Sequence, residues 1–272
     1  MNNILEDIKK RLNINFTEED IHEFKEGKTE AKVFSIKDKY LIKCSNEYDM
    51  NVFEAFLSKE DSKYFQKLYY VNKKLGYACL SFLPGRKFDE MKDIDYYINT
   101  IYDITSNYKK IDYEGFGYFN DDHKTWSEFL SSEIDYSNSI TVTEHLDDSL
   151  VREAIDVISK YKVEPFLMHG DFGTHNFIIN DDKLYVIDPM GVVGDPLYDF
   201  YFAIFSNVDI YTKIDLNKLL EYFNRDIEYK KAMMVVQFYI RLCRTYKYAR
   251  EDYPTYVEYF EIIKKIFKNN LD

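Results

Sequence analysis

The hydrophobic pattern changes its period once along the chain, and this change is the strongest constraint on the fold. Before Pro84 and Gly85, short apolar or alternating runs are separated by turn-forming residues, which is typical of β-strands. After them, apolar residues such as Ile94, Tyr97 and Ile98 recur every three or four positions, which is typical of amphipathic helices. The sequence therefore predicts an α+β protein with a β-rich first part and a mainly helical second part.

The individual runs predict the order of these elements. Strands are expected at residues 21–27, 31–36, 39–44, 68–71 and 77–83, with one helix at 50–58. Helices are expected at residues 93–107, 126–134, 148–161, 216–223, 229–248 and 255–267, with one β-hairpin among them at 177–187. We expect two domains, residues 1–85 and 86–272, with a cleft between them.

Composition excludes several classes of function. The net charge of −12 and the pI of about 5.0 argue against a nucleic-acid partner, and an acidic surface could attract a cationic substrate. The three cysteines, Cys44, Cys79 and Cys243, are odd in number and far apart, which indicates a reducing compartment. No run approaches the roughly 18 apolar residues of a membrane span. We expect a soluble, cytoplasmic protein with no membrane partner and no obligatory protein partner.

The segment 169–200, HGDFGTHNFIINDDKLYVIDPMGVVGDPLYDF, carries the densest set of chemically useful residues. Two strand-like runs, FIIN and LYVI, flank the turn-forming residues 181–183. An antiparallel hairpin closed by these three residues would place Phe177 opposite Ile187.

The same register would place Asn176 opposite Asp188, about 5 Å apart at Cα. A carboxylate and an amide oxygen at one end of a hairpin are hard ligands that suit Mg²⁺ beside the phosphates of a nucleotide. Asp171 lies on the loop that leads into the hairpin, where its carboxylate could orient an attacking hydroxyl or accept its proton. Together, these three residues are the arrangement that phosphoryl transfer requires.

These motifs resemble a known family. The pattern H-G-D-x-x-x-x-N, followed by I-D-P and G-D-P-x-x-D, is similar to the signature of the aminoglycoside phosphotransferase and choline kinase superfamily. The run 187–199 resembles streptomycin-type kinases, and residues 26–36 resemble the nucleotide loop of aminoglycoside 3′-kinases. The resemblance implies a protein-kinase-like bilobal fold. Residues 1–85 would form the nucleotide-binding lobe, and residues 86–272 the catalytic and substrate-binding lobe.

The resemblance also implies a role for each matching residue. Asp171 would be the catalytic carboxylate, and Asn176 and Asp188 would hold Mg²⁺. His169 would be a structural member of the loop, and Asp199 would brace that loop by hydrogen bonding.

Lys43, at the end of the third predicted strand, matches the lysine that contacts the phosphates in this family. Its expected partner is a carboxylate on the following helix. Glu54 is the chosen partner because it lies beside the apolar residues Phe53 and Phe56, and Glu47 is the competitor.

The remaining nucleotide contacts are also implied by the resemblance. Thr29 would offer a hydroxyl to the phosphates from a loop that has one glycine. The backbone C=O of Ser81 and N–H of Leu83 would bind the base of ATP or GTP. Trp126 matches a recurring aromatic residue of the family, for which a core position is favoured over a cation–π contact with the substrate.

Only ten residues separate Asp188 from Asp199, which leaves no room for the activation segment of a protein kinase. We therefore expect a kinase that transfers the γ-phosphate of a nucleoside triphosphate to a hydroxyl of an aminoglycoside-like small molecule, as in antibiotic resistance. The acceptor could be cationic and could be met by acids of the last helices, which are Glu251, Asp252, Glu258 and Glu261. One alternative is a metabolic kinase for choline, homoserine or a sugar. The other is a catalytically silent nucleotide-binding regulatory module.

Overall fold

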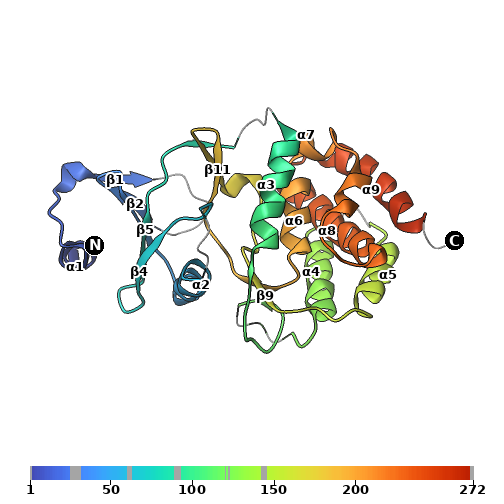
Figure 1. Ribbon diagram of the computed structural model, residues 1–272, viewed down its shortest axis with the longest axis horizontal. Coiled ribbons are helices and arrows are strands. Elements are labelled where there is room, and N and C mark those ends of the chain that lie inside the picture. The colour runs from blue at the N-terminus through green and yellow to red at the C-terminus, as the bar shows by residue number, and fades with distance from the viewer. Residues whose placement is uncertain are drawn as a thin grey trace. The chain divides into compact units, whose positions relative to one another are not determined.

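The chain forms two compact units. The computed structural model describes residues 2–24, 32–59, 63–88, 93–119, 121, 123–141 and 146–269 (Figure 1). The first unit contains Met1–Phe88 and Asn176–Met190, and the second contains Asp89–His175 and Gly191–Asp272. The hairpin thus belongs to the first unit, whereas the division expected from the sequence at residue 85 assigned it to the second domain. The predicted α+β class is confirmed, with an antiparallel sheet in the first unit and mainly helices in the second.

A five-stranded antiparallel sheet forms the centre of the first unit, in the strand order β1-β2-β3-β5-β4. Its strands are β1 (Ile21–Phe24), β2 (Lys32–Ile36), β3 (Tyr40–Cys44), β4 (Leu68–Asn72) and β5 (Tyr77–Ser81). The expected turn between β2 and β3 is present, with Lys37 and Asp38 in the left-handed backbone region at φ of 54° and 47°. All five predicted strands of this part are therefore confirmed, although their ends differ by a few residues.

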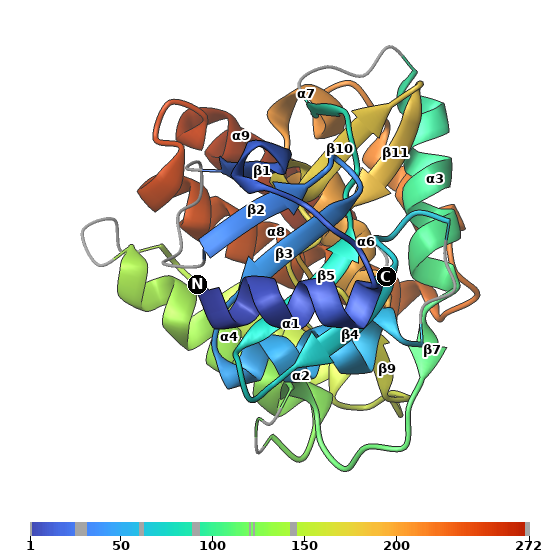
Figure 2. The same cartoon turned by 90° about the vertical axis from the view of Figure 1, so that its left-hand side faces the viewer.

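Two helices cover opposite faces of this sheet, as the two views of the ribbon show (Figures 1 and 2). Helix α1 (Asn2–Leu12) precedes the sheet in the sequence, and α2 (Glu47–Leu57) follows β3. The side chain of Asn46 begins α2 by accepting the Asp49 N–H at 2.9 Å. Helix α2 buries five residues, which are Met50, Val52, Phe53, Phe56 and Leu57.

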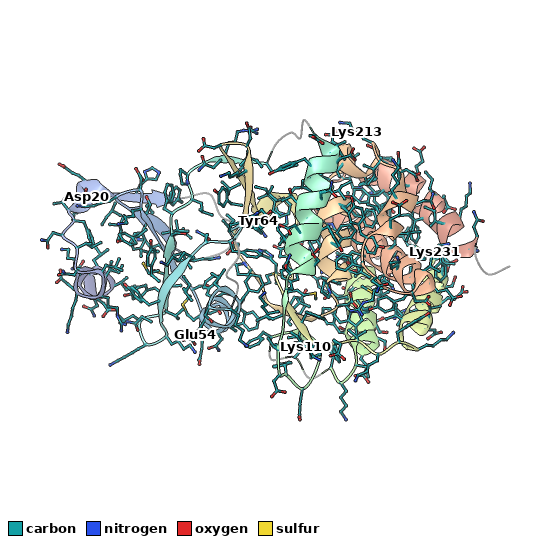
Figure 3. The ribbon with its side chains drawn as sticks, viewed as in Figure 1. Asp20, Glu54, Tyr64, Lys110, Lys213 and Lys231 are labelled. Carbon is teal, nitrogen blue, oxygen red and sulfur yellow. The ribbon has the colours of Figure 1, made fainter. Side chains whose placement is uncertain are left out.

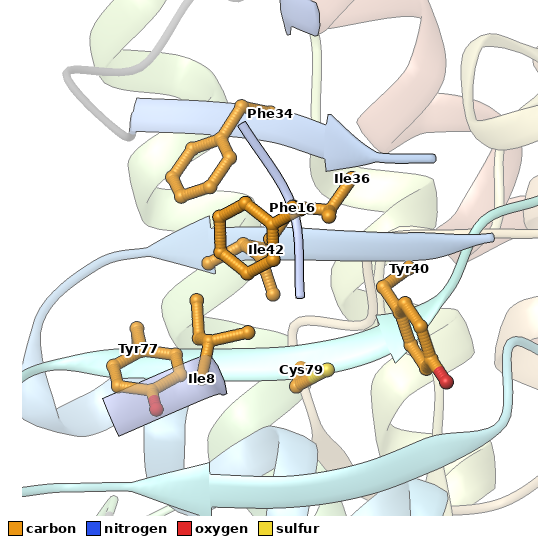
Figure 4. Close-up of a cluster of buried hydrophobic side chains, with 8 residues drawn as sticks. All are labelled: Ile8, Phe16, Phe34, Ile36, Tyr40, Ile42, Tyr77 and Cys79. Atoms are coloured by element: carbon orange, nitrogen blue, oxygen red, sulfur yellow. The ribbon is translucent and has the colours of Figure 1, made fainter. Parts of the chain in front are cut away.

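Helix α1 is fixed to the sheet by a core cluster and by one carboxylate. The cluster consists of Ile8, Phe16, Phe34, Ile36, Tyr40, Ile42, Tyr77 and Cys79 (Figure 4). At its edge Asp7 accepts hydrogen bonds from the Tyr77 hydroxyl at 2.6 Å, Asn72 Nδ2 at 2.6 Å and Arg11 Nε at 2.9 Å. The hydrogen bond from Tyr77 is the largest effect on the pKa of Asp7, and the pKa is lowered although partial burial opposes it.

The expected hairpin is present, but its register differs from the predicted one. Strands β10 (Phe177–Asn180) and β11 (Lys183–Val186) pair with Phe177 opposite Val186, so that residue 176 lies opposite Ile187 and not Asp188. The loop contains only Asp181 and Asp182, both left-handed at φ of 48° and 57°. Aspartate tolerates this conformation, which a two-residue hairpin turn requires at both positions. The three-residue turn predicted from the sequence was therefore wrong by one residue.

A third strand, β6 (Arg86–Lys87), pairs with the other edge of β10. The backbone N–H of Val186 also donates to the Tyr64 carbonyl at 2.8 Å. These contacts explain why the hairpin groups with the first unit.

The second unit is built around a long buried helix, α8 (Ile227–Tyr248), which packs against α4, α5, α6 and α9. Its other helical elements are α3 (Ile94–Ser106), α4 (Trp126–Ile140), α5 (Ser149–Ile158), α6 (Leu197–Phe205), α7 (Val208–Tyr211), the 3₁₀ segment η3 (Leu216–Glu221) and α9 (Tyr253–Lys268). Helices α6 and α7 were not predicted. Every residue of α6 is buried, so this helix has no polar face to produce the amphipathic spacing.

A small four-stranded sheet, in the order β7-β9-β12-β8, completes the second unit and was also not predicted. Its strands are β7 (Lys109–Lys110), β8 (Gly117–Tyr118), β9 (Phe166–Met168) and β12 (Val192–Gly194). Strands of two or three residues are too short to show a period of two. None of the helices that the structure describes is both long enough and apolar enough to cross a membrane. All three cysteines are free.

The Asp7 contacts predict a pH-dependent stability. Because the pKa of Asp7 is lower in the folded chain, its contribution is present above the unfolded pKa of about 4 and is lost as the pH falls through the folded pKa. We expect Asp7→Asn to lower the free energy of unfolding at pH 7 by about 1–3 kcal/mol, and to make its loss between pH 5 and pH 2 smaller.

Urea unfolding across this pH range would measure both effects. The control is Glu6→Gln on the same helix, whose exposed ion pair with Lys9 should contribute less than about 1 kcal/mol. Equal pH profiles for wild type and Asp7→Asn would contradict the assignment.

Candidate active site

The loop His169–Asn176, here called the HGD loop, is braced by a buried carboxylate. Asp199 is 0% exposed and accepts hydrogen bonds from the Gly170 N–H at 3.1 Å and the Tyr108 hydroxyl at 2.9 Å. Burial raises the pKa of Asp199 to about 7, although these hydrogen bonds oppose the rise. The bracing role expected for Asp199 is confirmed.

Glycine is required at the second position of the HGD loop. Gly170 has φ of +82°, and a Cβ there would lie 2.6 Å from the Val192 side chain. The preceding residue, His169, is 0% exposed, and its Nδ1 accepts the Asp171 N–H at 3.3 Å. His169 therefore has the structural place in the loop that the resemblance implied.

Asp171 is held in its ionised form. Its side chain is 27% exposed, and Oδ2 lies 3.0 Å from His175 Nε2. Burial would raise the pKa of Asp171, but the hydrogen bond from His175, with the charges of His175, His169 and Arg241, lowers it to about 2. The carboxylate is thus available as an acceptor over the whole neutral range.

His175 and Arg241 are two residues near Asp171 that the sequence analysis missed. His175 follows Asp171 by four positions and lies in a 3₁₀ turn, Thr174–Asn176, so this spacing could have indicated the contact. Arg241 lies 70 residues beyond Asp171 on α8, and no local pattern connects the two.

Lys43 and Asp188 form an ion pair in the first unit. The Lys43 side chain, at the end of β3, is only 13% exposed, and its ammonium lies 5.2 Å from the centre of the Phe53 ring. Asp188 has a left-handed backbone at φ of 70°, a strained conformation for a residue other than glycine. The structure therefore brings together two of the predicted site residues.

Asn176 lies at the base of the same hairpin, where it is 7% exposed and its carbonyl accepts the Ile187 N–H at 3.0 Å. Because of the corrected register, Asn176 is opposite the residue that precedes Asp188. One amide oxygen and one carboxylate are the hard ligands that Mg²⁺ prefers, so the two residues fit this ion by their chemistry. Among the described residues, no group of three or more His, Cys, Asp and Glu side chains is arranged to hold a metal by itself.

The expected pairing of Lys43 with Glu54 was wrong. Glu54 forms an ion pair with Lys73 at 2.5 Å, and its side chain is 55% exposed. Figure 3 labels Glu54 on helix α2. Consecutive helical residues point about 100° apart, so a glutamate next to the buried Phe53 faces away from it. Within the described part of the chain, Asp188 is the carboxylate that pairs with Lys43, and Glu47 does not replace it.

Helix α2 contacts the backbone near Asp188 through a tyrosine and not through a glutamate. The hydroxyl of Tyr48 donates a hydrogen bond to the Met190 carbonyl at 2.9 Å. This contact ties the first turn of α2 to the backbone that follows Asp188.

Comparison with known proteins identifies a family that this sequence matches. The sequence matches the phosphotransferase enzyme family over residues 56–234, about two thirds of the chain. The chain belongs to this family. The expected superfamily is confirmed, and the protein has the fold of a kinase-type phosphotransferase. No curated protein sequence matches it significantly.

Solved structures of similar fold come from several kinds of phosphotransferase. A thermostable mutant of aminoglycoside phosphotransferase APH(4)-Ia, in ternary complex with ADP and hygromycin B, matches with a TM-score of 0.61 and 16% identity over 97% of this chain and 98% of that one. Choline kinase LicA from Streptococcus pneumoniae gives 0.55 and 18% over 98% of both chains. A putative fructosamine-3-kinase from Haemophilus somnus 129PT gives 0.59 and 17% over 99% and 97%. At these identities the likeness shows the fold alone.

The GDP motif of this phosphotransferase is structural. A Cβ on Gly194 would collide with the six-membered ring of Trp126, which is 2% exposed and stacks on Phe129. Asp195 is 1% exposed, accepts the N–H of the residue two positions later at 3.0 Å and pairs with Arg225 at 3.2 Å. The core position favoured for Trp126 is thus confirmed.

The residues predicted to bind the nucleotide base of this phosphotransferase lie at the end of β5. The Ser81 carbonyl accepts a hydrogen bond from Gln66 Nε2 at 2.9 Å, and a carbonyl can accept a second one. Leu83 follows β5 by two residues. Thr29 lies outside the described residues. These three contacts stay predictions.

The contact between His175 and Asp171 can be tested without knowing the substrate. We expect His175→Ala to raise the pKa of Asp171 from about 2 toward or above the ordinary value of about 3.9, because burial then acts with less opposition. A ¹³C NMR titration of the carboxyl signal, assigned by its loss in Asp171→Asn, would measure it.

The matched control is His123→Ala, a histidine 3.7 Å from Asp121, which should leave the Asp171 titration unchanged. If the Asp171 signal titrates identically in wild type and His175→Ala, the proposed electrostatic role of His175 is wrong.

Proposed function

We propose that this phosphotransferase transfers the γ-phosphoryl group of a nucleoside triphosphate to a hydroxyl of a small molecule. The observation that carries the proposal is the ionised Asp171 in an HGD loop braced by Asp199. Such a carboxylate can orient a hydroxyl and accept its proton as the phosphorus–oxygen bond forms. An alcohol is not nucleophilic enough at neutral pH without such positioning.

The first unit supplies the residues proposed for the donor. Lys43 would neutralise phosphate oxygens, while Thr29, Ser81 and Leu83 would bind the remaining phosphate and base atoms of ATP or GTP. Support comes from the fold relatives, among which APH(4)-Ia was solved with ADP and with AMP-PNP. Glu54 has no place in this proposal, because its carboxylate is paired with Lys73.

Asn176 and Asp188 would hold Mg²⁺, which would supply positive charge to the phosphates when bound. Proteins usually bind this ion through one or two carboxylates together with substrate phosphates, which agrees with a site too small to hold it by itself. In the free chain the ammonium of Lys43 balances the Asp188 carboxylate. The strained backbone at Asp188 and the Tyr48 contact at Met190 would hold the carboxylate in one direction.

Catalysis would depend mainly on positioning and on charge. Asp171 would hold the acceptor hydroxyl in line with the phosphoryl group, and His175 is a positioning residue because it acts through the Asp171 carboxylate. Lys43 would stabilise the charge on the phosphate oxygens in the transition state. We propose that the nucleotide-binding domain expected at residues 1–85 also includes the hairpin of the first unit, and that the rest of residues 86–272 is the catalytic and acceptor domain. We place the activity in the reducing cytoplasm, because the three cysteines are odd in number and far apart in the sequence.

Two classes of acceptor agree with this reaction. An aminoglycoside-like acceptor, with antibiotic resistance as the outcome, is supported by the fold relatives solved with hygromycin B or streptomycin. A metabolic alcohol, amine or sugar derivative is supported by the relatives named choline kinase and fructosamine-3-kinase. A panel of both classes, scored by acceptor-dependent ADP release, would distinguish them. Absence of ADP release with every acceptor of both classes would favour the catalytically silent regulatory module.

Substitutions at the two carboxylates should affect different quantities. We expect Asp171→Asn to lower kcat by about 10²- to 10⁴-fold with little change in the KM for nucleotide, because the residue orients the acceptor. We expect Asp188→Ala to remove Mg²⁺-dependent turnover and nucleotide protection against thermal unfolding. Both variants should fold, since the Asp188 side chain is 46% exposed and Asp171→Asn keeps the size of the side chain and one of its hydrogen-bond acceptors.

The control is Glu54→Gln, which should retain near-normal kcat because Glu54 does not contact Lys43. Asp188→Ala with normal Mg²⁺-dependent turnover would refute the metal assignment, and Asp171→Asn with normal kcat would refute the mechanism.

A further inference from the structure

Helix α8 presents two arginines three residues apart, Arg241 and Arg244, which therefore lie near the same side of the helix. Arg244 is neutralised inside the second unit. Its Nη2 lies 2.6 Å from Glu133 Oε2, and Glu133 is only 5% exposed. The hydroxyls of Tyr118 and Tyr198 lie 3.3 and 3.5 Å from the same carboxylate. The charge of Arg244 is thus balanced within the protein.

Arg241 has no such balance. Unlike Arg244, it forms no ion pair with any carboxylate of the described residues, and its Nε, like that of Arg244, is buried without a hydrogen-bond partner among them. Its guanidinium lies 4.7 Å from the centre of the Phe202 ring. Burial lowers the pKa of Arg241, yet an arginine in a protein remains charged. The Tyr256 hydroxyl and the negative charge of Asp171 offset part of the cost of burying this cation. A guanidinium without an ion-pair partner would gain further from an anion that binds to it directly.

The place of Arg241 connects it to the HGD loop. Phe202, on which it stacks, lies against that loop, since a Cβ on Gly173 would be 2.9 Å from Phe202 Cε1 and 2.7 Å from the His175 ring. His175 in turn contacts Asp171 at 3.0 Å. One aromatic ring thus separates the guanidinium from the turn that carries the proposed base, and the charge of Arg241 acts on the Asp171 carboxylate.

We infer that Arg241 binds an anionic group, a carboxylate or a phosphate, on the acceptor whose hydroxyl Asp171 orients. The planar guanidinium matches such groups with two parallel hydrogen bonds. The acceptor would then be a hydroxy acid or a phosphorylated alcohol. This acceptor differs from the cationic one expected from the acidic composition. Phosphorylation of the anionic molecule rests on the proposed function, whereas anion binding by Arg241 does not depend on it.

Two physical arguments favour this inference over a purely structural role. Arg244 is an example of a structural arginine on this helix, because its charge is paired with the buried Glu133 carboxylate, which also has hydroxyl groups around it. In addition, a polycationic acceptor at Asp171 would bring its ammonium groups next to Arg241 and would be repelled by it. A carboxylate or phosphate would be attracted there instead.

Binding can be tested by NMR on the full chain with AMP-PNP and Mg²⁺ present in excess. The arginine Nε–Hε signals would be followed during titration with D-glycerate, with its uncharged analogue glyceramide as the matched probe. The Arg241 signal is identified by its absence in Arg241→Lys. We expect the Arg241 signal to shift saturably with glycerate and not with glyceramide. The signal of Arg250, which stacks on Tyr246, should not shift with either probe. No shift at Arg241, or an equal shift with both probes, would overturn the inference.

Turnover provides the second measurement. Acceptor pairs that differ only in a carboxylate or phosphate against a neutral amide or ester would be compared by ADP release. We expect Arg241→Met to lower kcat/KM for the anionic member about 10- to 100-fold, the range for a lost charge-assisted hydrogen bond, with an unchanged KM for nucleotide. Arg241→Lys should recover part of this loss, and Arg250→Met should show none.

The two proposals fail in different ways. If neutral or cationic acceptors are phosphorylated as well as anionic ones and Arg241→Met has no effect, the proposed function stands and the anion site is wrong. If no acceptor is phosphorylated, the proposed function fails, and the NMR titration still decides whether Arg241 binds an anion. If Arg241→Met does not fold, as judged by its melting temperature, Arg241→Lys carries the kinetic comparison, and wild-type kinetics in it on the anionic acceptors would count against the inference.

Discussion

The buried carboxylate of Asp199, with the Gly170 N–H and the Tyr108 hydroxyl that donate to it, is the contact on which the geometry of the HGD loop depends. A buried acid without donors is expensive, so the three groups must stay together for the second unit to fold. Gly170 directly precedes Asp171, and its backbone conformation is one that a side chain would not permit. The position of the proposed base is therefore set by backbone hydrogen bonding to a helix that is buried throughout.

The charged residues near this loop fall into two groups, those joined in ion pairs and those that are not. Glu133 and Arg244 neutralise each other in the interior, and Asp195 is paired with Arg225. Asp171 and Arg241 remain as two opposite charges that are close enough to interact but not joined in an ion pair. A polar acceptor with a hydroxyl and an anionic group would satisfy both, which is how one unit could select a substrate and position it with the same two residues.

Much of this architecture could be predicted from the sequence, and the errors have local physical reasons. The strands of the first unit and the long helices follow their apolar periods, and the resemblance identified the family from the HGD, IDP and GDP motifs. Glu54 was assigned wrongly because a buried neighbour in sequence was taken as a buried neighbour in space, whereas a helix turns by about 100° per residue. Strands β7, β8, β9 and β12 are too short to have a period at all. His175 and Arg241 act through contacts with Asp171 that become visible only when the chain is folded.

The turn between β10 and β11 has a consequence for how this protein can change over evolutionary time. Asp181 and Asp182 are both left-handed, so several residues with a tolerance for that conformation could replace them, glycine and asparagine included. The number of residues in the turn is more strictly constrained. One inserted residue would slide β11 along β10 and invert the faces of every side chain after it, so that the Asp188 carboxylate would leave Lys43. Among natural variants of this chain, we would thus expect the residue types in this turn to vary while its length stays the same.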